Sequence, residues 1–310
     1  MDDYLPIESW TSVSGGKSSA YMALNFPTDR YIFSCVLTSD PECVIRDKSL
    51  RRYCKSKLPW FDWDNGGSRE VDLTLSNLRR LEQMLGKEIE WVSALFTFDE
   101  VIAGTVNPAE AKTHGARATP NSPMLPNSRM RFCTTTMKVL PVTWHVLLNS
   151  QYDYRERPVL MNIGYRWDEA RRVEDWKCQR VKLPLRCDIE GRFRGKHRHT
   201  EVDYRIVEFP MYNNRVDQLD VARFWADQGW TWPRVSNCDG CFFHQAHEQL
   251  LQAQRYPERM AWWEKQEEKI GATFGNAPRR EILKKAEEDS KATQLTLGLD
   301  SQDFMCLCSD

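Results

Sequence analysis

The sequence predicts an α/β protein with a parallel sheet flanked by helices and a cysteine-containing helical extension at the C-terminus. Two observations favour this fold class. Short apolar runs rich in strand-forming residues alternate with segments of helical spacing, as in βαβ units. The first apolar run, residues 8–13, leads directly through Gly15 and Gly16 into the helix-like segment 20–24. With 310 residues, the chain is long enough for one large domain or two small ones.

The remaining elements follow from the same patterns. Further strands are predicted at 31–37, 89–95 and 158–163. Helices are predicted at 73–85, 138–148, 219–228, about 245–269 and 278–289. Two segments lack periodicity: 41–70, which we interpret as an irregular insertion, and 104–130, whose four prolines indicate a long loop. The chain after Arg166 is expected to be charged and loop-rich as far as the helix at 219. We expect an α/β domain over 1–235 and a cysteine-containing helical extension over 236–310.

Charge and composition limit the classes of function. The net charge is −1 with 28% charged residues, so no overall field draws the protein to nucleic acid or to an anionic membrane. The acidic N-terminus lacks the apolar run of a signal peptide, and no stretch is long enough to span a bilayer, which predicts a cytoplasmic protein without a membrane partner. Ten cysteines in such a protein indicate thiols, metal ligands or redox groups rather than disulfides.

The glycine turn after the first strand has the construction of an anion site. Backbone amides of such a turn, together with the positive end of the following helix, form a concave site for phosphate. The spacing is not that of a Walker A loop. We therefore predict that phosphate groups bind Ser14, Gly15, Gly16, Lys17, Ser18 and Ser19. The alternative is an ordinary Gly-Gly turn that opens a helix.

Two later segments add charged and nucleophilic side chains. In 131–141, Arg131 and Lys138 lie near Cys133, and nearby cations favour a thiolate for metal ligation or anion binding. An inert buried cysteine is the alternative there. In 163–172, which follows a predicted strand where open α/β sheets bind ligands, the cations able to converge on phosphate or sulfate are Arg166, Arg171 and Arg172. A solvated start of a charged helix is the alternative.

The cysteines at 238 and 241 form a Cys-x-x-Cys on a glycine turn, which directs two thiolates at one metal ion. Two ligands cannot close a site. The tail offers Cys306 and Cys308, and Cys178 and Cys187 are weaker candidates. His244 and His247 continue the spacing and leave a tetrahedral zinc site open as an alternative. Three others are expected to be inert: Cys35, Cys43 and Cys54.

Three segments occur in the chain in the order Ser-Gly-Gly-x-x-Ser (14–19), R-x-C…K-x-x-P (131–141) and G-x-R-x-x-E-x-R-R (164–172). With the Cys-x-x-Cys, they resemble the phosphoadenosine phosphosulfate (PAPS) reductase family of the PP-loop, or adenine nucleotide α-hydrolase-like, superfamily over residues 10–243. The last segment is one residue shorter than the family's G-x-R-x-x-E-x-x-R-R. The family often has Asp where this chain has Ser18, and one branch has a second cysteine where this chain has Thr134.

The resemblance implies a PP-loop, Rossmann-like fold and an adenine nucleotide as ligand, whether ATP, PAPS or adenylylsulfate (APS). It implies that the phosphates bind 14–19 and that the sulfate or phosphate end lies near Arg166, Arg171 and Arg172. It also implies a [4Fe–4S] cluster, with zinc as the alternative. Its expected ligands are Cys133, Cys238, Cys241 and, as the best fourth candidate, Cys306.

Three functions follow as expectations. The first is sulfonucleotide reduction, an oxidoreductase reaction with a thiol reductant such as thioredoxin; the catalytic candidates are Lys138, Cys306 and Cys308, although the family's Glu-Cys-Gly-x-His tail motif is absent. The second is an ATP-dependent adenylylating sulfurtransferase, as in DNA phosphorothioation or tRNA thiolation, with nucleic acid held by the basic loop 186–199. The third is a non-catalytic nucleotide-binding accessory protein of a mobile element or defence system. The sequence leaves open whether the protein is a homodimer.

Overall fold

The computed structural model describes residues 7–106, 122–127, 130–152, 157–177, 182–183, 200–201, 205–233 and 238–297. Within them, five parallel strands form one sheet in the order β5-β2-β1-β6-β9. Their bounds are β1 Ser9–Val13, β2 Arg30–Ser34, β5 Ile89–Val92, β6 Val159–Asn162 and β9 Arg205–Glu208. In chain order the five strands therefore read 3-2-1-4-5, and the direction of the winding reverses between β1 and β6. The predicted α/β fold with a parallel sheet is confirmed.

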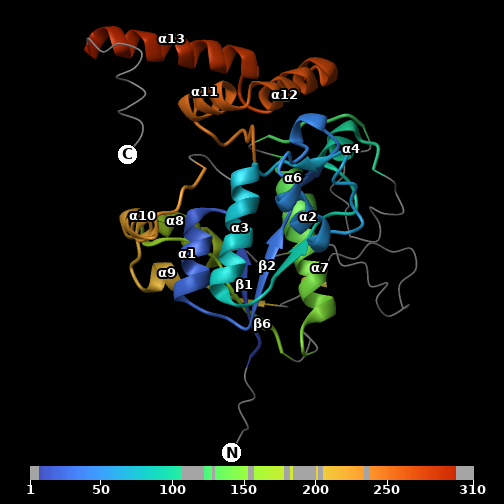
Figure 1. The fold of residues 1–310 in the computed structure, drawn as a ribbon, viewed down its shortest axis with the longest axis vertical. Coiled ribbons are helices and arrows are strands. Elements are labelled where there is room, and N and C mark those ends of the chain that lie inside the picture. Colours follow the sequence, from blue (N-terminus) through green and yellow to red (C-terminus); the bar gives the residue numbers. More distant parts are fainter. Residues whose placement is uncertain are drawn as a thin grey trace, which may run out of the picture.

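Helices cover both faces of this sheet (Figure 1). One face packs against α1 Lys17–Asn25, α2 Lys48–Lys57, α3 Asp72–Leu85 and α10 Gln218–Asp227. The other face packs against α4 Phe98–Ala103 and α7 Leu140–Asn149. The side chains of β2 alternate between the two faces. Tyr31 and Phe33 are buried in the apolar cluster that includes α1, α2, α3 and α10, whereas Ile32 is buried in the cluster that includes α4 and α7.

Most predicted elements are present with shifted ends. The helix predicted at 73–85 is α3, and Gly86 ends it in the left-handed conformation (φ +61°). The strand predicted at 31–37 stops at Ser34, and a separate short strand, β3 Leu37–Thr38, pairs with β4 Gly67–Ser68. The helix expected from 138 begins earlier, as α6 Phe132–Thr134, and continues through a π-helical turn, Thr135–Val139, into α7.

The interpretation of 41–70 as irregular was wrong. The segment contains a 3₁₀ turn, Pro41–Cys43, and the ten-residue helix α2. Asp47 caps this helix by accepting from the backbone N–H groups of its first turn, and the buried pair Leu50 and Cys54 lies one helical turn apart. Three basic residues of this helix face solvent: Lys48, Arg52 and Lys55.

Two further predictions need correction. β9 lies in the stretch that was expected to be loop, because its charged, half-exposed residues at the edge of the sheet give little apolar signal. The helix predicted at about 245–269 is two helices, α11 Ala246–Arg255 and α12 Pro257–Ile270. Pro257 has no N–H and pushes Tyr256 out of the helical region, which separates them. Most of the predicted loop 104–130 lies outside the described residues.

The C-terminal helices α11, α12 and α13 Arg279–Leu297 lie beyond one end of the sheet (Figure 1, orange and red). Met260, Trp263 and Phe274 join the same apolar cluster as Trp10 of β1. The division at 235 and 236 stays a prediction. The remaining elements are Trp167–Glu169 (3₁₀), α8 Ala170–Lys177, β7 Lys182–Leu183, β8 Thr200–Glu201 and α9 Pro210–Asn213. None of the helices that the structure describes combines the length and apolar character of a membrane span.

Candidate active site

A cavity of about 660 Å³ lies at the carboxyl ends of β1 and β6, where the winding of the sheet reverses. Open α/β sheets bind ligands at this position, and the volume lies in the usual range for small-molecule sites. The predicted site residues that line the cavity are Ser14, Gly15, Gly16, Lys17, Ser18, Ser19, Cys133, Lys138, Arg166, Arg172, Cys238 and Cys241. Segments more than 200 residues apart in the chain therefore share one cavity.

The phosphate loop between β1 and α1 is held by its own side chains. Ser19 Oγ accepts from Ser14 N and donates to the carbonyl oxygen of Gly16 (both 3.0 Å). Gly15 has φ +81°, which favours glycine, and Gly16 caps α1 without a side-chain hydrogen bond. The first-turn amides of α1 are therefore not satisfied by a side-chain cap, as in helix N-termini that bind anions.

The segment after β6 approaches this loop closely. Arg166 Nη1 donates to Ser18 Oγ (2.9 Å), and its Nε and Nη2 donate to Asp168 (both 3.0 Å). A Cβ on Gly164 would lie 3.3 Å from Ser19 Cα, so glycine allows the approach. Ser18, which stands where the resembling family often has Asp, thus contacts the predicted anion-binding arginine.

The other two arginines of this segment differ from each other. Arg172 lines the cavity, and its guanidinium lies 4.2 Å from the centroid of the Tyr165 ring. Arg171 is exposed and is not among the residues that line the cavity. Arg131 and Phe243 also line the cavity, and the Arg131 guanidinium lies 4.6 Å from the centroid of the Phe243 ring.

Three cysteines lie on the wall of the cavity: Cys133, Cys238 and Cys241 are free and partly buried. Burial raises the pKa of the Cys133 thiol and, more strongly, that of Cys238, against the opposing effect of the Lys138 ammonium. Three cysteine sulfurs are suitable ligands for zinc or for an iron–sulfur cluster. Across the described residues, however, no three His, Cys, Asp or Glu side chains come together closely enough to hold an ion.

The other expected ligands do not complete this set. Four of the predicted cysteines lie outside the described residues, as does the basic loop 186–199: Cys178, Cys187, Cys306 and Cys308. Of the two histidines considered for zinc, His244 is buried and His247 exposed, and neither lines the cavity.

Lys138 reaches the cavity from the π-helical turn, an irregularity frequent at functional sites. Its Nζ lies 3.2 Å from Oε1 of Glu70, a carboxylate with 0% exposure. Cys238 Sγ is 3.8 Å from the same oxygen. Burial alone would lower the pKa of Lys138, but Cys238 and Glu70 outweigh burial and raise it, which keeps the side chain an ammonium ion.

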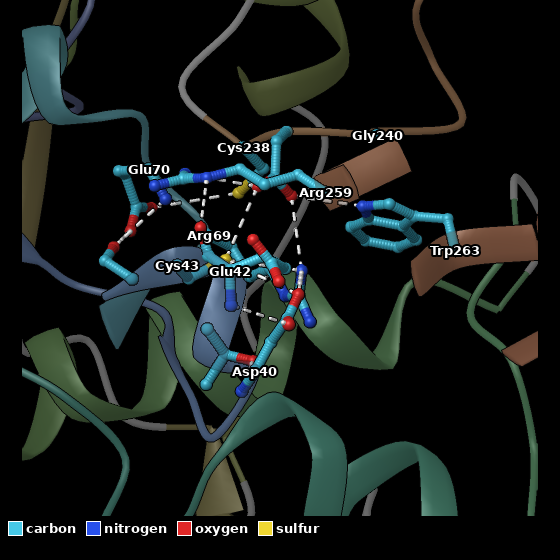
Figure 2. Close-up of polar contacts among 12 residues, drawn as sticks. Asp40, Glu42, Cys43, Arg69, Glu70, Cys238, Gly240, Arg259 and Trp263 are labelled. Atoms are coloured by element: carbon cyan, nitrogen blue, oxygen red, sulfur yellow. Dashed lines mark hydrogen bonds and ion pairs between the residues drawn. The ribbon is translucent and has the colours of Figure 1, made fainter. Parts of the chain in front are cut away.

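A buried polar network fixes the Cys-x-x-Cys turn (Figure 2). Asp239, 1% exposed, accepts from Trp263 Nε1 (3.1 Å) and Arg259 Nη1 (3.4 Å) of α12. Its backbone N–H donates to the carbonyl oxygen of Arg69 (2.7 Å). The C-terminal helices therefore determine where the two thiols lie.

Sequence reasoning missed Arg69 and Glu70, which belong to the segment interpreted as irregular. Arg69 is 1% exposed, lines the cavity and lies 3.6 Å from the centroid of the Trp262 ring. No motif or spacing marks either residue, because their partners come from distant parts of the chain.

Comparison with known proteins finds no relative: no family model, no curated protein and no solved structure matches the chain. Fold and cavity together define an α/β protein with a candidate ligand site at the reversal point of a parallel sheet.

Proposed function

We propose that the protein is a PAPS reductase-like enzyme that binds an adenine nucleotide and carries out sulfonucleotide reduction or a related sulfur transfer beside a cysteine-ligated [4Fe–4S] cluster. One observation carries the proposal: the phosphate loop and three cysteine thiols line the same cavity. The PP-loop fold and the family resemblance are part of this proposal.

At one end of the cavity, the phosphates of the nucleotide would accept hydrogen bonds from the amides at the start of α1. Lys17, Arg166 and Arg172 line the same region and supply positive charge. Arg166 is already oriented by Ser18 and Asp168, so little side-chain entropy is lost when an anion binds.

At the other end, Cys133, Cys238 and Cys241 would ligate the cluster as thiolates. Burial favours the protonated thiol of Cys238, so a bound metal or a nearby cation is needed to hold it deprotonated. A cluster bound here would supply a thiolate-ligated redox centre beside the nucleotide. Lys138 would supply a positive charge beside these thiols for the reacting anion. The nucleophile candidates remain Cys306 and Cys308.

A second candidate is the ATP-dependent sulfurtransferase acting on nucleic acid. It is favoured by the two arginine–aromatic pairs of the cavity lining, Arg131 with Phe243 and Arg172 with Tyr165. Aromatic faces beside cations suit the bases and phosphates of a single strand. Phe243 is 52% exposed, which leaves its ring available for such stacking.

Metal analysis after anaerobic purification tests the cluster. We expect iron and sulfide near cluster stoichiometry in the native protein and their loss in Cys238→Ala. Cys54→Ala is the matched control, since Cys54 is a fully buried thiol that does not line the cavity, and this variant should retain iron. Zinc alone at one per chain would refute the cluster.

Nucleotide assays then separate the candidate functions. Binding of ATP, APS and PAPS is measured first, followed by turnover. Sulfite release from APS or PAPS with thioredoxin supports reduction, whereas conversion of ATP to AMP and pyrophosphate with a nucleic acid acceptor supports the second candidate. Binding without turnover would indicate an accessory protein, and absence of binding to all three nucleotides would refute the proposal.

A further inference from the structure

Glu70 is a buried carboxylate whose two oxygens face different groups. Oε2 accepts from the backbone N–H of Val36 (3.0 Å) and from the hydroxyl of Ser68. Oε1 faces Lys138 Nζ (3.2 Å) and Cys238 Sγ (3.8 Å). One oxygen is therefore fixed to the strand region, while the other is directed at the cation and thiol of the cavity wall.

The buried carboxylate of Glu70 requires a cation, and Lys138 supplies it. A buried carboxylate without a cation is strongly destabilising, and Lys138 is its one salt-bridge partner among the described residues. Lys138 has a long, flexible side chain that is 31% exposed and lines the cavity. No other carboxylate of the described residues forms an ion pair with the Lys138 ammonium.

The same segment also fixes the thiol. Glu70 forms an isolated antiparallel bridge with Cys238, and the adjacent backbone hydrogen bond joins Asp239 to Arg69. The carboxylate and the thiol are therefore attached to each other through the backbone, and an ammonium held by Glu70 is held beside Cys238 (Figure 2 shows Glu70 and Cys238).

We propose that Glu70 is a positioning residue that holds the Lys138 ammonium beside Cys238, at the thiol end of the cavity. The consequence for catalysis rests on the proposed function, because the cation would then face the anion to be transferred. The placement itself can be measured without nucleotide, metal or turnover.

The test uses the full chain, reduced and freed of metal by a chelator. Cys238 is alkylated separately with anionic iodoacetate and neutral iodoacetamide, and each rate is followed on the Cys238 peptide by mass spectrometry. The rate with iodoacetate is divided by the rate with iodoacetamide. Both reagents react with the thiolate, so the thiolate fraction cancels and this ratio reports the charge near the sulfur. Lys138→Gln removes one positive charge near the sulfur and should lower the ratio of the iodoacetate rate to the iodoacetamide rate about fivefold, the effect of one unit charge at short range in a water-like medium. Glu70→Asp keeps the carboxylate charge but shortens its reach by one methylene, and it should lower the same ratio because the ammonium is no longer held beside Cys238.

Two results would overturn the proposal. If Lys138 stays in place when the reach of Glu70 is shortened, Glu70→Asp leaves the ratio unchanged. If Glu70→Asp lowers the ratio as much in a Lys138→Gln background as in the native protein, Glu70 does not act through the lysine.

Glu82→Gln is the matched control, since Glu82 pairs with Lys57 outside the cavity and its loss should not change the ratio. Glu70→Gln is a second, independent variant, because it removes the carboxylate charge. If the ammonium moves away with that charge, as we expect, the ratio stays near its native value. If Lys138 stays beside Cys238, the ratio rises about fivefold, and this result would count against the proposal.

Discussion

At the scale of single residues, Gly240 determines how closely the Cys-x-x-Cys turn packs on α12. Its φ is +58°, and a Cβ there would lie 2.3 Å from Trp263 Nε1. Gly86 has a similar φ of +61° but nothing within 4 Å. We expect Gly86→Ala to cost about 1 kcal/mol from the backbone alone and Gly240→Ala about 2–4 kcal/mol, because overpacking adds to it. Urea unfolding of the metal-free variants measures the difference, and equal losses would contradict the clash.

The sequence identifies residues whose partners are local and misses those whose partners are distant. The phosphate loop is recognisable because the glycines, hydroxyls and helix start are consecutive, and Ser19 bonds within it. Glu70 and Lys138 are 68 residues apart, and Glu70 and Cys238 are 168 apart. Only the fold brings these three together, so no spacing rule could reveal Glu70.

At the scale of secondary-structure elements, strong charge hid two of them. The helix α2 was missed because its basic face dominates the segment, although Asp47 gives a capping signal and Leu50 and Cys54 give a helical spacing. Strand β9 is half-exposed at the sheet edge and has no clear period-two pattern. Buried strands with both faces covered, such as β2, were predictable because their apolar runs are continuous.

Glu90 ties three elements together and gives the fold a dependence on pH. It accepts from Arg30 of β2 and from His145 of α7, both at 2.6 Å. Burial alone would raise the pKa of Glu90, but the hydrogen bonds from His145 and Arg30 outweigh it and lower the pKa. Since the unfolded pKa is about 4.3, the stabilisation is complete above that pH and is lost as the pH falls through the lower folded value.

The corresponding variant is Glu90→Gln. We expect it to lower the free energy of unfolding at pH 7 by about 1–3 kcal/mol, the usual range for hydrogen bonds to a charged group. The difference from the native protein should shrink below pH 4. Glu287→Gln, at an exposed pair with Lys291, is the control and should change neither value. Urea unfolding at pH 7 and pH 3.5 measures both, and a difference as large at pH 3.5 as at pH 7 would contradict the assignment.

At the scale of the whole molecule, the fold class was predictable and the assembly of the site was not. Alternating strands and helices indicate a parallel sheet, and a phosphate loop after its first strand indicates where a ligand binds. The thiol end depends on how the C-terminal helices pack against the Cys-x-x-Cys turn. Arg259 and Trp263 of α12 hold Asp239. Gln252 of α11 and Arg279 of α13 bond the backbone of Gly240. This packing arises from buried charges whose partners the sequence does not mark.

Because the phosphate loop and the thiols share one cavity, a bound nucleotide should shield the cysteines. With ATP at about ten times its Kd, we expect alkylation of Cys133, Cys238 and Cys241 by iodoacetamide to slow about tenfold, in proportion to the free fraction of the site. Adenosine, which lacks phosphates, should give little protection, and Arg166→Gln should require more ATP for the same effect. Rates are read on each cysteine peptide in the metal-free chain. If calorimetry shows ATP bound while all three thiols react at their original rates, the nucleotide does not occupy this cavity, and the phosphate loop and the thiols would not form one site.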